Sequence, residues 1–376
     1  MQRTKASEQS PAQKAASTVR RRDKPIRQEQ RLIPSGCTVL NCALSDCAFG
    51  GFGQGKIANI IGESSAGKTM IAETLLAEMA NDPRYDDYDL YLDDSEHALE
   101  MDIAGLFGSK AEKRIKAPRY SSDGEPLYSD TVEQCYARIL SLLAEGRPFV
   151  YVLDSLDTLT DASEYDQASE LSKAAAKLDD NDQLTMPGSY GMAKAKLMSQ
   201  ILRTLKGALA KTNSTLIIIS QTRDNPNARP GTPTKRRAGG KALEFYCTHT
   251  VWLTVTKTHK AGKKGAEEII GRQVEAKVTK NKLTGKVRSV CFDIFYDYGV
   301  DDIGSCIDFL VKYGVIKQKG AYLDASCLGY TESMYRSKLI EALEEEDNMQ
   351  QLRELVHSCW QEKESALSLN RAPRFK

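Results

Sequence analysis

One eight-residue segment restricts the fold of this chain more than any other. Residues 62–69 read GESSAGKT and fit the pattern G-x-x-x-x-G-K-[ST]. The apolar run 56–61 before the segment predicts a buried strand, and Met70, Leu75 and Met79 after it recur at helical spacing. In that context the glycines let backbone N–H groups turn toward phosphate oxygens, and the helix directs its positive end at them. The segment therefore predicts a phosphate-binding loop.

The loop also predicts how a nucleotide would be held. Lys68 is expected to reach the β and γ phosphates, and Thr69 to offer its hydroxyl to Mg²⁺. A plain strand-to-helix turn is the alternative interpretation, and the strand before and helix after the segment argue against it. We expect the nucleotide to contact the whole segment: Gly62, Glu63, Ser64, Ser65, Ala66, Gly67, Lys68 and Thr69.

Three further apolar strands end in polar residues. Strand 149–153 is followed by Asp154, strand 90–92 by acidic residues that include Glu96, and strand 216–220 by Gln221. Because the carboxyl ends of parallel strands open into one crevice, these side chains are expected to converge on the loop. We predict that Asp154 is the second Mg²⁺ ligand, although a capping Asp would give the same local pattern. Glu96 is placed to orient or deprotonate a water molecule, and Gln221 to sense the γ-phosphate.

The order of the predicted elements indicates the fold class. Strands alternate with helices as far as residue 220, which predicts an α/β fold with a mostly parallel sheet covered on both faces. Later strands lack long intervening helices and are expected to extend one edge antiparallel: 250–256, 274–278 and 290–295. Segments 161–190 and 222–240 are predicted to be long polar loops. Beyond residue 300 we expect a small helical region, in which the acidic run 341–347 forms a solvated helix face.

The charge of the chain is nearly balanced in total but not along its length. There are 52 Lys and Arg against 51 Asp and Glu, so a polyanion would have to bind local patches. Residues 1–31 carry nine basic and three acidic residues, and residues 223–241 carry six against one. The 41% hydrophobic content excludes collagen-like, mucin-like and fully disordered classes. No apolar run is long enough to span a membrane, the start lacks the apolar core of a secretory signal, and the nine cysteines show no zinc-site spacing, so we expect a cytosolic protein.

The motifs follow one another as they do in a known family. In order along the chain they read GESSAGKT, DDSEHAL, VYVLDSLDTL, MSQILRTL, IIISQTR, GGKALEFY and KVTKNKLTGK. This series resembles RecA-type homologous recombinases, including the phage UvsX branch, over residues 31–325. The resemblance implies a RecA-like P-loop ATPase core at 32–300, after a basic, flexible polymerisation arm at 1–31 and before a small, α-rich C-terminal domain with an acidic helix at 301–376.

The resemblance also implies an activity. It is a DNA-dependent ATPase that uses ATP and Mg²⁺, self-associates into a helical filament on single-stranded DNA, and catalyses pairing and strand exchange with a homologous duplex in recombination and repair. Loader and single-strand-binding proteins are the expected partners, and no membrane association is expected. The expected location of the protein is the cytoplasm of a bacterium or of a phage's host.

Individual residues acquire roles from the same resemblance. Glu96 is the hydrolytic glutamate, Gln221 couples the nucleotide to the DNA-binding loops, and Lys280 and Lys282 reach the γ-phosphate of the neighbouring subunit. Two loops, near 179–196 and 222–240, line the DNA. The residues implied to bind DNA are Lys196, Ser199, Arg203, Arg223, Arg236, Arg237, Gly239, Gly240 and Lys241.

Two departures from the family pattern bear on the site. Ile103 stands where bacterial members commonly place an adenine-stacking Tyr, and Glu244 stands where many have Lys. Two other classes of function stay open at this point. One is a different RecA-fold ATPase, such as a ring helicase or a KaiC-like regulatory protein. The other is a non-enzymatic scaffold on single-stranded DNA.

Overall fold

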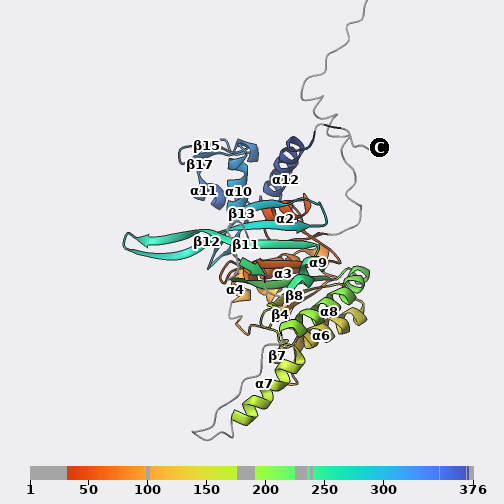
Figure 1. The fold of residues 1–376 in the computed structure, drawn as a ribbon. Coiled ribbons are helices and arrows are strands. Elements are labelled where there is room, and N and C mark those ends of the chain that lie inside the picture. Colours follow the sequence, from red (N-terminus) through yellow and green to blue (C-terminus); the bar gives the residue numbers. More distant parts are fainter. Residues whose placement is uncertain are drawn as a thin grey trace, which may run out of the picture. The chain divides into compact units, whose positions relative to one another are not determined.

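A ten-stranded mixed sheet forms the centre of the protein (Figure 1). The computed structural model describes residues 32–98, 102–175, 191–224, 235–237, 240–346, 348–369 and 371, and Leu32–Lys376 make one compact unit. From one edge to the other the strands are β14 (Gly299–Asp301), β13 (Arg288–Phe295), β12 (Ala266–Asn281), β11 (His249–Lys263), β3 (Ile57–Gly62), β9 (Thr215–Asp224), β8 (Phe149–Asp154), β4 (Asp89–Asp94) and β5 (Ile115–Lys116), with β10 (Lys235–Arg237) paired to β9.

Alternate side chains of the central strands enter two different hydrophobic cores. In β8, Val150 and Val152 join one core, whereas Phe149, Tyr151 and Leu153 join the other. Both faces are buried, as the continuous apolar runs predict for parallel strands. The first core is built with α2 (Thr38–Ser45), α3 (Lys68–Asn81), α10 (Asp302–Lys312) and α12 (Met349–Ala366); the second with α6 (Val132–Glu145), α8 (Gly191–Thr212) and α9 (Gly240–Tyr246).

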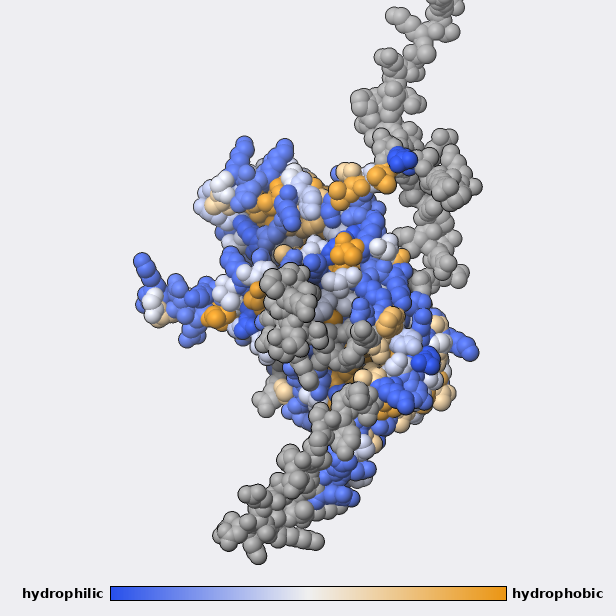
Figure 2. Space-filling view, viewed as in Figure 1, coloured by the Kyte–Doolittle hydropathy of each residue, from blue (hydrophilic) through white to orange (hydrophobic). Residues whose placement is uncertain are grey.

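The predicted antiparallel edge begins one strand later than the sequence suggests. β11 is parallel to β3, and the antiparallel pairing at this edge begins between β11 and β12 and continues through β13 and β14. β11 can be parallel because the chain reaches it from β9 by a crossover through β10 and α9. β11 and β12 are also longer than predicted and form a hairpin in which every residue of the end, 261–270, is exposed. Figure 2 shows mainly hydrophilic residues on this projecting hairpin.

The two segments predicted as polar loops contain regular structure. Within 161–190, residues Ala162–Ala175 form helix α7, so the loop prediction is wrong there. The segment is rich in good helix formers, and the Asp161 carboxylate accepts a hydrogen bond from the Glu164 amide at 3.1 Å, which stabilises the first turn. Within 222–240, Thr222–Asp224 extend β9 and pair with β10 in an antiparallel hairpin.

The region beyond residue 300 contains strands as well as the expected helices. α10, α11 (Arg336–Glu345) and α12 accompany a three-stranded sheet of β15 (Lys317–Lys319), β16 (Tyr322–Asp324) and β17 (Met334–Tyr335). The acidic side chains Glu344, Glu345 and Glu346 are exposed, as predicted for a solvated helix face. No described helix is long and apolar enough to cross a membrane. The smaller elements are β1 (Leu32–Ile33), β2 (Phe52–Gly53), η1 (Pro83–Tyr85), α4 (Ile103–Phe107), α5 (Ser109–Arg114), β6 (Arg119–Tyr120), β7 (Pro126–Leu127) and η2 (Ser326–Leu328).

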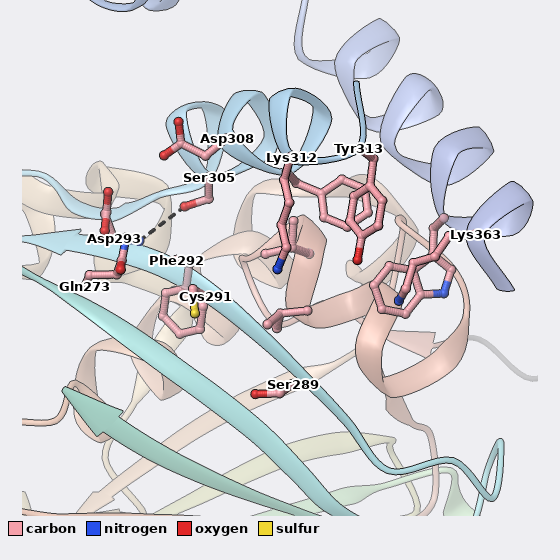
Figure 3. A pocket seen from close by; sticks show the side chains of 14 residues that line it. Gln273, Ser289, Cys291, Phe292, Asp293, Ser305, Asp308, Lys312, Tyr313 and Lys363 are labelled. Atoms are coloured by element: carbon pink, nitrogen blue, oxygen red, sulfur yellow. Dashed lines mark hydrogen bonds between the residues drawn. The ribbon is translucent and has the colours of Figure 1, made fainter. Parts of the chain in front are cut away.

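Trp360 fixes helix α12 to the core. Its side chain is completely buried, its ring stacks on Phe309 at 5.9 Å between centroids, and its indole N–H donates to Asp46 at 2.9 Å. A cavity of about 100 Å³ opens beside it between β13, α10 and α12 (Figure 3). Two lysines line this cavity, and the Lys363 ammonium lies 3.7 Å from the centre of the Trp360 ring. The lysine therefore contributes a cation–π contact to the docking of the helix.

Replacing Trp360 by Ala should lower the free energy of unfolding by about 3–5 kcal/mol, because it removes a large buried side chain and leaves a cavity. Denaturant titration followed by circular dichroism measures this change. Leu367→Ala is the matched control, since Leu367 is 72% exposed just after the same helix, and it should change the value by less than about 0.5 kcal/mol. Equal effects of the two substitutions would contradict the docking role of Trp360.

Candidate active site and DNA-binding elements

The strand register brings four polar strand ends together. Gly62 of β3 lies opposite Gln221 of β9, and Asp94 of β4 lies opposite Asp154 of β8. β9 and β8 are adjacent, so the four strands stand in the order β3, β9, β8, β4 with all their carboxyl ends on one side. The strand ends next to the loop and next to Asp154, Glu96 and Gln221 therefore lie at one edge of the sheet.

The phosphate-binding loop joins β3 to α3 in a conformation that depends on glycine. Gly67 has φ +82° and immediately precedes the helix, and a Cβ at this position would lie 2.3 Å from the Ile294 side chain. Ser65 also has positive φ, at 60°. Lys68 is buried, and its ammonium donates to the Glu63 carbonyl at 2.7 Å. The lysine thus lies folded over the loop, where phosphate oxygens could replace that carbonyl.

Thr69 and Asp154 form the pair of oxygen ligands expected for Mg²⁺. The Thr69 hydroxyl donates to the Asp154 carboxylate at 2.5 Å. Burial raises the pKa of Asp154 to about 6, against the lowering effect of this hydrogen bond. A hydroxyl and a carboxylate are hard oxygen donors of the kind Mg²⁺ takes beside substrate phosphates, so these residues fit the ion. Among the described residues, no cluster of three or more His, Cys, Asp and Glu offers a protein-only metal site.

Glu96 is held by two hydrogen bonds from neighbouring strand ends. Its carboxylate accepts from the Ser155 hydroxyl at 2.6 Å and from the Gln221 side-chain amide at 2.8 Å. The backbone N–H of Gln221 in turn donates to the Asp157 carboxylate at 2.6 Å. Glu96 is only partly buried, so a water molecule can reach it. The arrangement suits a carboxylate that orients a reactant without moving itself.

The predicted DNA-binding residues of α8 lie on the surface. Lys196 and Arg203 are exposed, and Ser199 is half-buried. The Arg203 guanidinium donates to the Tyr246 hydroxyl of α9 at 3.2 Å, and this contact lowers the pKa of Tyr246. α8 and α9 thus share a polar contact on the face that the sequence assigns to DNA.

The basic second segment is described only in part. Arg223 belongs to β9, Arg236 and Arg237 to β10, and Gly240 and Lys241 begin α9. Gly239 lies outside the described residues, as do the side chains of the four basic residues just named.

Lys280 and Lys282 contact the carboxyl end of α9. The Lys280 ammonium donates to the carbonyls of Glu244 and Phe245, and that of Lys282 donates to Phe245 at 3.1 Å. Burial and the neighbouring Lys282 lower the pKa of Lys280. Glu244 and Phe245 themselves are exposed. The two lysines therefore end at the surface of the subunit, beside helix α9.

Comparison with known proteins agrees with this geometry. The family model for the RecA N-terminal domain matches residues 13–301. The RecA proteins of Leifsonia xyli and Acidothermus cellulolyticus are each 32% identical over 291 residues, which cover 77% of this chain and 71% and 73% of theirs. That of Bifidobacterium breve is 31% identical over 306 residues, 81% of this chain and 68% of its own.

The chain belongs to the RecA family. It is accordingly a recombinase with DNA-dependent ATPase activity, and it uses a nucleotide, binds DNA and forms filaments as the family does. The match favours this function over a ring helicase or a KaiC-like ATPase.

Several contacts of this RecA-family site are not evident from sequence motifs. Ser155 follows Asp154 directly and Asp157 stands three residues after it; both lie in the motif VYVLDSLDTL, which marks their positions but not their partners. Ile103, at the position of the family's adenine-stacking Tyr, begins α4 and packs against the first core. Arg272 of β12 donates to the Ser65 carbonyl of the phosphate-binding loop, and no local pattern marks it.

A buried acid lies beneath the same site. Glu73 of α3 has no exposed surface, and neither carboxyl oxygen has a hydrogen-bond partner among the described residues. Burial, followed by the charges of Asp154 and Asp94, raises the pKa of Glu73 from 4.5 to about 8. The side chain is therefore protonated at neutral pH in the nucleotide-free protein.

Glu73 should make the stability of the protein depend on pH. The raised pKa favours the folded state fully below about pH 4.5, and this contribution is lost as the pH rises toward about 8. Glu73→Gln cannot ionise, so its free energy of unfolding relative to wild type should increase by roughly 1 kcal/mol per pH unit between pH 5 and 8. Denaturant titrations in magnesium-free buffer measure the difference. Glu341→Gln, at an exposed site, should give a flat difference; a flat difference for Glu73→Gln would refute the assignment.

Proposed function

We propose that this RecA-family protein polymerises on single-stranded DNA with bound ATP and Mg²⁺, pairs the strand with a homologous duplex and exchanges strands. The observation that supports this proposal best is the hydrogen-bonded group of Glu96, Ser155 and Gln221 at the strand ends beside the phosphate-binding loop. In this group the carboxylate of Glu96, which would act in hydrolysis, is hydrogen-bonded to Gln221 of β9, and β9 continues directly into the basic second segment.

The loop and its helix would bind the nucleotide. Backbone N–H groups of residues 62–69 and the amino end of α3 face the phosphates, and Lys68 exchanges the Glu63 carbonyl for phosphate oxygens. Thr69 and Asp154 would hold Mg²⁺, which neutralises phosphate charge when bound. With the cation in place, Asp154 would be ionised despite its burial.

Glu96 would act on the attacking water. Its carboxylate is oriented by Ser155 and Gln221, and it orients or deprotonates the water so that ATP and water give ADP and inorganic phosphate. Lys280 and Lys282 of one subunit would approach the γ-phosphate held by the next. To do so they would release the carbonyls of α9.

Loss of the γ-phosphate could then be transmitted to DNA. Gln221 is three residues from the end of β9, and β9 pairs with β10, which carries Arg236 and Arg237. A change at Gln221 therefore moves the strand that positions these arginines. Bound nucleotide would order this segment against DNA, and hydrolysis would release it.

Replacing Glu96 by Gln tests the hydrolytic step. We expect ATP turnover on single-stranded DNA to fall at least 100-fold, because the general base is lost while the shape of the side chain is kept. Nucleotide binding and filament formation, seen by negative-stain microscopy, should persist. Lys68→Ala is the contrasting variant and should lose both binding and filaments. Wild-type ATPase activity that does not respond to single-stranded DNA, together with absence of joint molecules, would refute the proposed function.

The Arg236→Glu/Arg237→Glu variant tests the basic segment. It should weaken binding to single-stranded DNA of any sequence and reduce the slope of log affinity against log salt by about 0.7 for each phosphate that the segment no longer neutralises. Fluorescence anisotropy at several salt concentrations provides the slope. Lys110→Glu/Lys113→Glu on α5 makes the same change in net charge away from the segment and should leave the slope unchanged. Equal slopes in the two variants would remove residues 235–237 from the DNA site.

A further inference from the structure

Arg272 contacts the phosphate-binding loop from a position on β12 that precedes the motif containing Lys280 and belongs to no nucleotide motif itself. Its Nη1 donates to the Ser65 carbonyl at 2.7 Å, and its Nε donates to the Tyr296 hydroxyl at 3.0 Å. The Tyr296 ring also lies against the guanidinium, 6.0 Å from its centre. Two hydrogen bonds from different nitrogens fix the plane of a guanidinium, so the group is oriented as well as located.

Arg272 has no acidic partner in the part of the chain that the structure describes, and the residue is only half-buried. A guanidinium has five N–H donors, and the two hydrogen bonds leave three of them unused. A cation with free donors therefore lies against a loop whose backbone is shaped for phosphate.

The loop and the arginine are held at a fixed separation. Arg272 lies opposite Ile294 in the pairing of β12 with β13, and Ile294 is the residue that fills the space beside Gly67. The loop therefore rests on the same pair of strands that carries the guanidinium. The pairing of β12 with β13 thus holds the backbone of Arg272 beside the loop.

We propose that Arg272 is a phosphate-binding residue of the nucleotide site, which uses its free N–H groups to bind the polyphosphate of a nucleotide in the same subunit. This rests on the proposed nucleotide binding at residues 62–69. Lys68 reaches the loop from α3 and Arg272 from the sheet, and they contact different carbonyls of the loop, those of Glu63 and Ser65. The triphosphate carries more negative charge than Mg²⁺ and Lys68 together neutralise, which leaves a role for a second basic side chain.

The test measures the affinity of the full-length protein for a fluorescent ATP analogue by titration, without DNA. Arg272→Gln should weaken binding about tenfold, and this loss should shrink as NaCl is raised because a half-exposed charge is screened. Lys277→Gln removes a positive charge from an exposed position on the same strand and should bind like wild type. Arg272→Lys keeps the charge and should recover part of the affinity.

Tyr296→Phe separates the orientation of Arg272 from its charge. It deletes only the hydroxyl that accepts from Nε and should weaken binding about threefold in wild type but not in the Arg272→Gln background. Wild-type affinity in Arg272→Gln, or a loss independent of salt, would overturn the inference and leave Arg272 as a brace for the loop. Lys68→Ala distinguishes failure of this inference from failure of the proposed nucleotide site. If wild type and Lys68→Ala bind the analogue equally, the nucleotide site itself is wrong.

Discussion

The parallel register of β3, β9, β8 and β4 is the constraint on which the rest of the structure depends. Successive side chains of β8 and β9 enter opposite cores, so a slip of one residue would exchange the two hydrophobic faces of either strand. The free-energy cost of exposing apolar side chains in this way fixes the register, and therefore the position at which each strand ends. Glu96, Asp154 and Gln221 are within reach of the loop because the packing of apolar residues, and not any attraction among the polar ones, sets their positions.

The same burial that fixes the strands makes the site electrostatically unbalanced. Asp154 and Glu73 have raised pKa values and Lys68 has a lowered pKa, each with burial as the first cause. Charged groups at a desolvated strand end favour a ligand that brings opposite charge. In a nucleotide with Mg²⁺ the phosphates bring negative charge to Lys68 and the ion brings positive charge to Asp154. This is consistent with the nucleotide-dependent assembly on DNA proposed above.

Helix α9 lies between the elements assigned to the nucleotide and those assigned to DNA. Lys280 and Lys282 hold the carbonyls at its carboxyl end, and Tyr246 of the same helix contacts Arg203 of α8. The structure therefore offers two physical connections between the sites, one through α9 and one along β9 from Gln221. Both depend on hydrogen bonds to backbone or side-chain oxygens rather than on apolar packing.

Much of the fold and of the active site was predictable from the sequence alone. The phosphate-binding loop, the central strands and the residues at their ends are local patterns, because burial on both faces leaves a continuous apolar run and the polar residue after it marks the strand end. Helix α7 was missed because the polarity of its segment was given more weight than its helix-forming residues. The direction of β11 was missed because the pairing of distant segments leaves no local signal.

Only the tertiary structure decided which side chains meet across long sequence separations. Ser155 with Glu96, Tyr246 with Arg203, and Arg272 with Ser65 come from different elements, and nothing in the residues around each one specifies its partner. Such contacts follow from strand order and helix packing, which sum interactions over the whole chain. The sequence by itself thus determined the chemistry that this protein carries, and the fold determined which groups can act together.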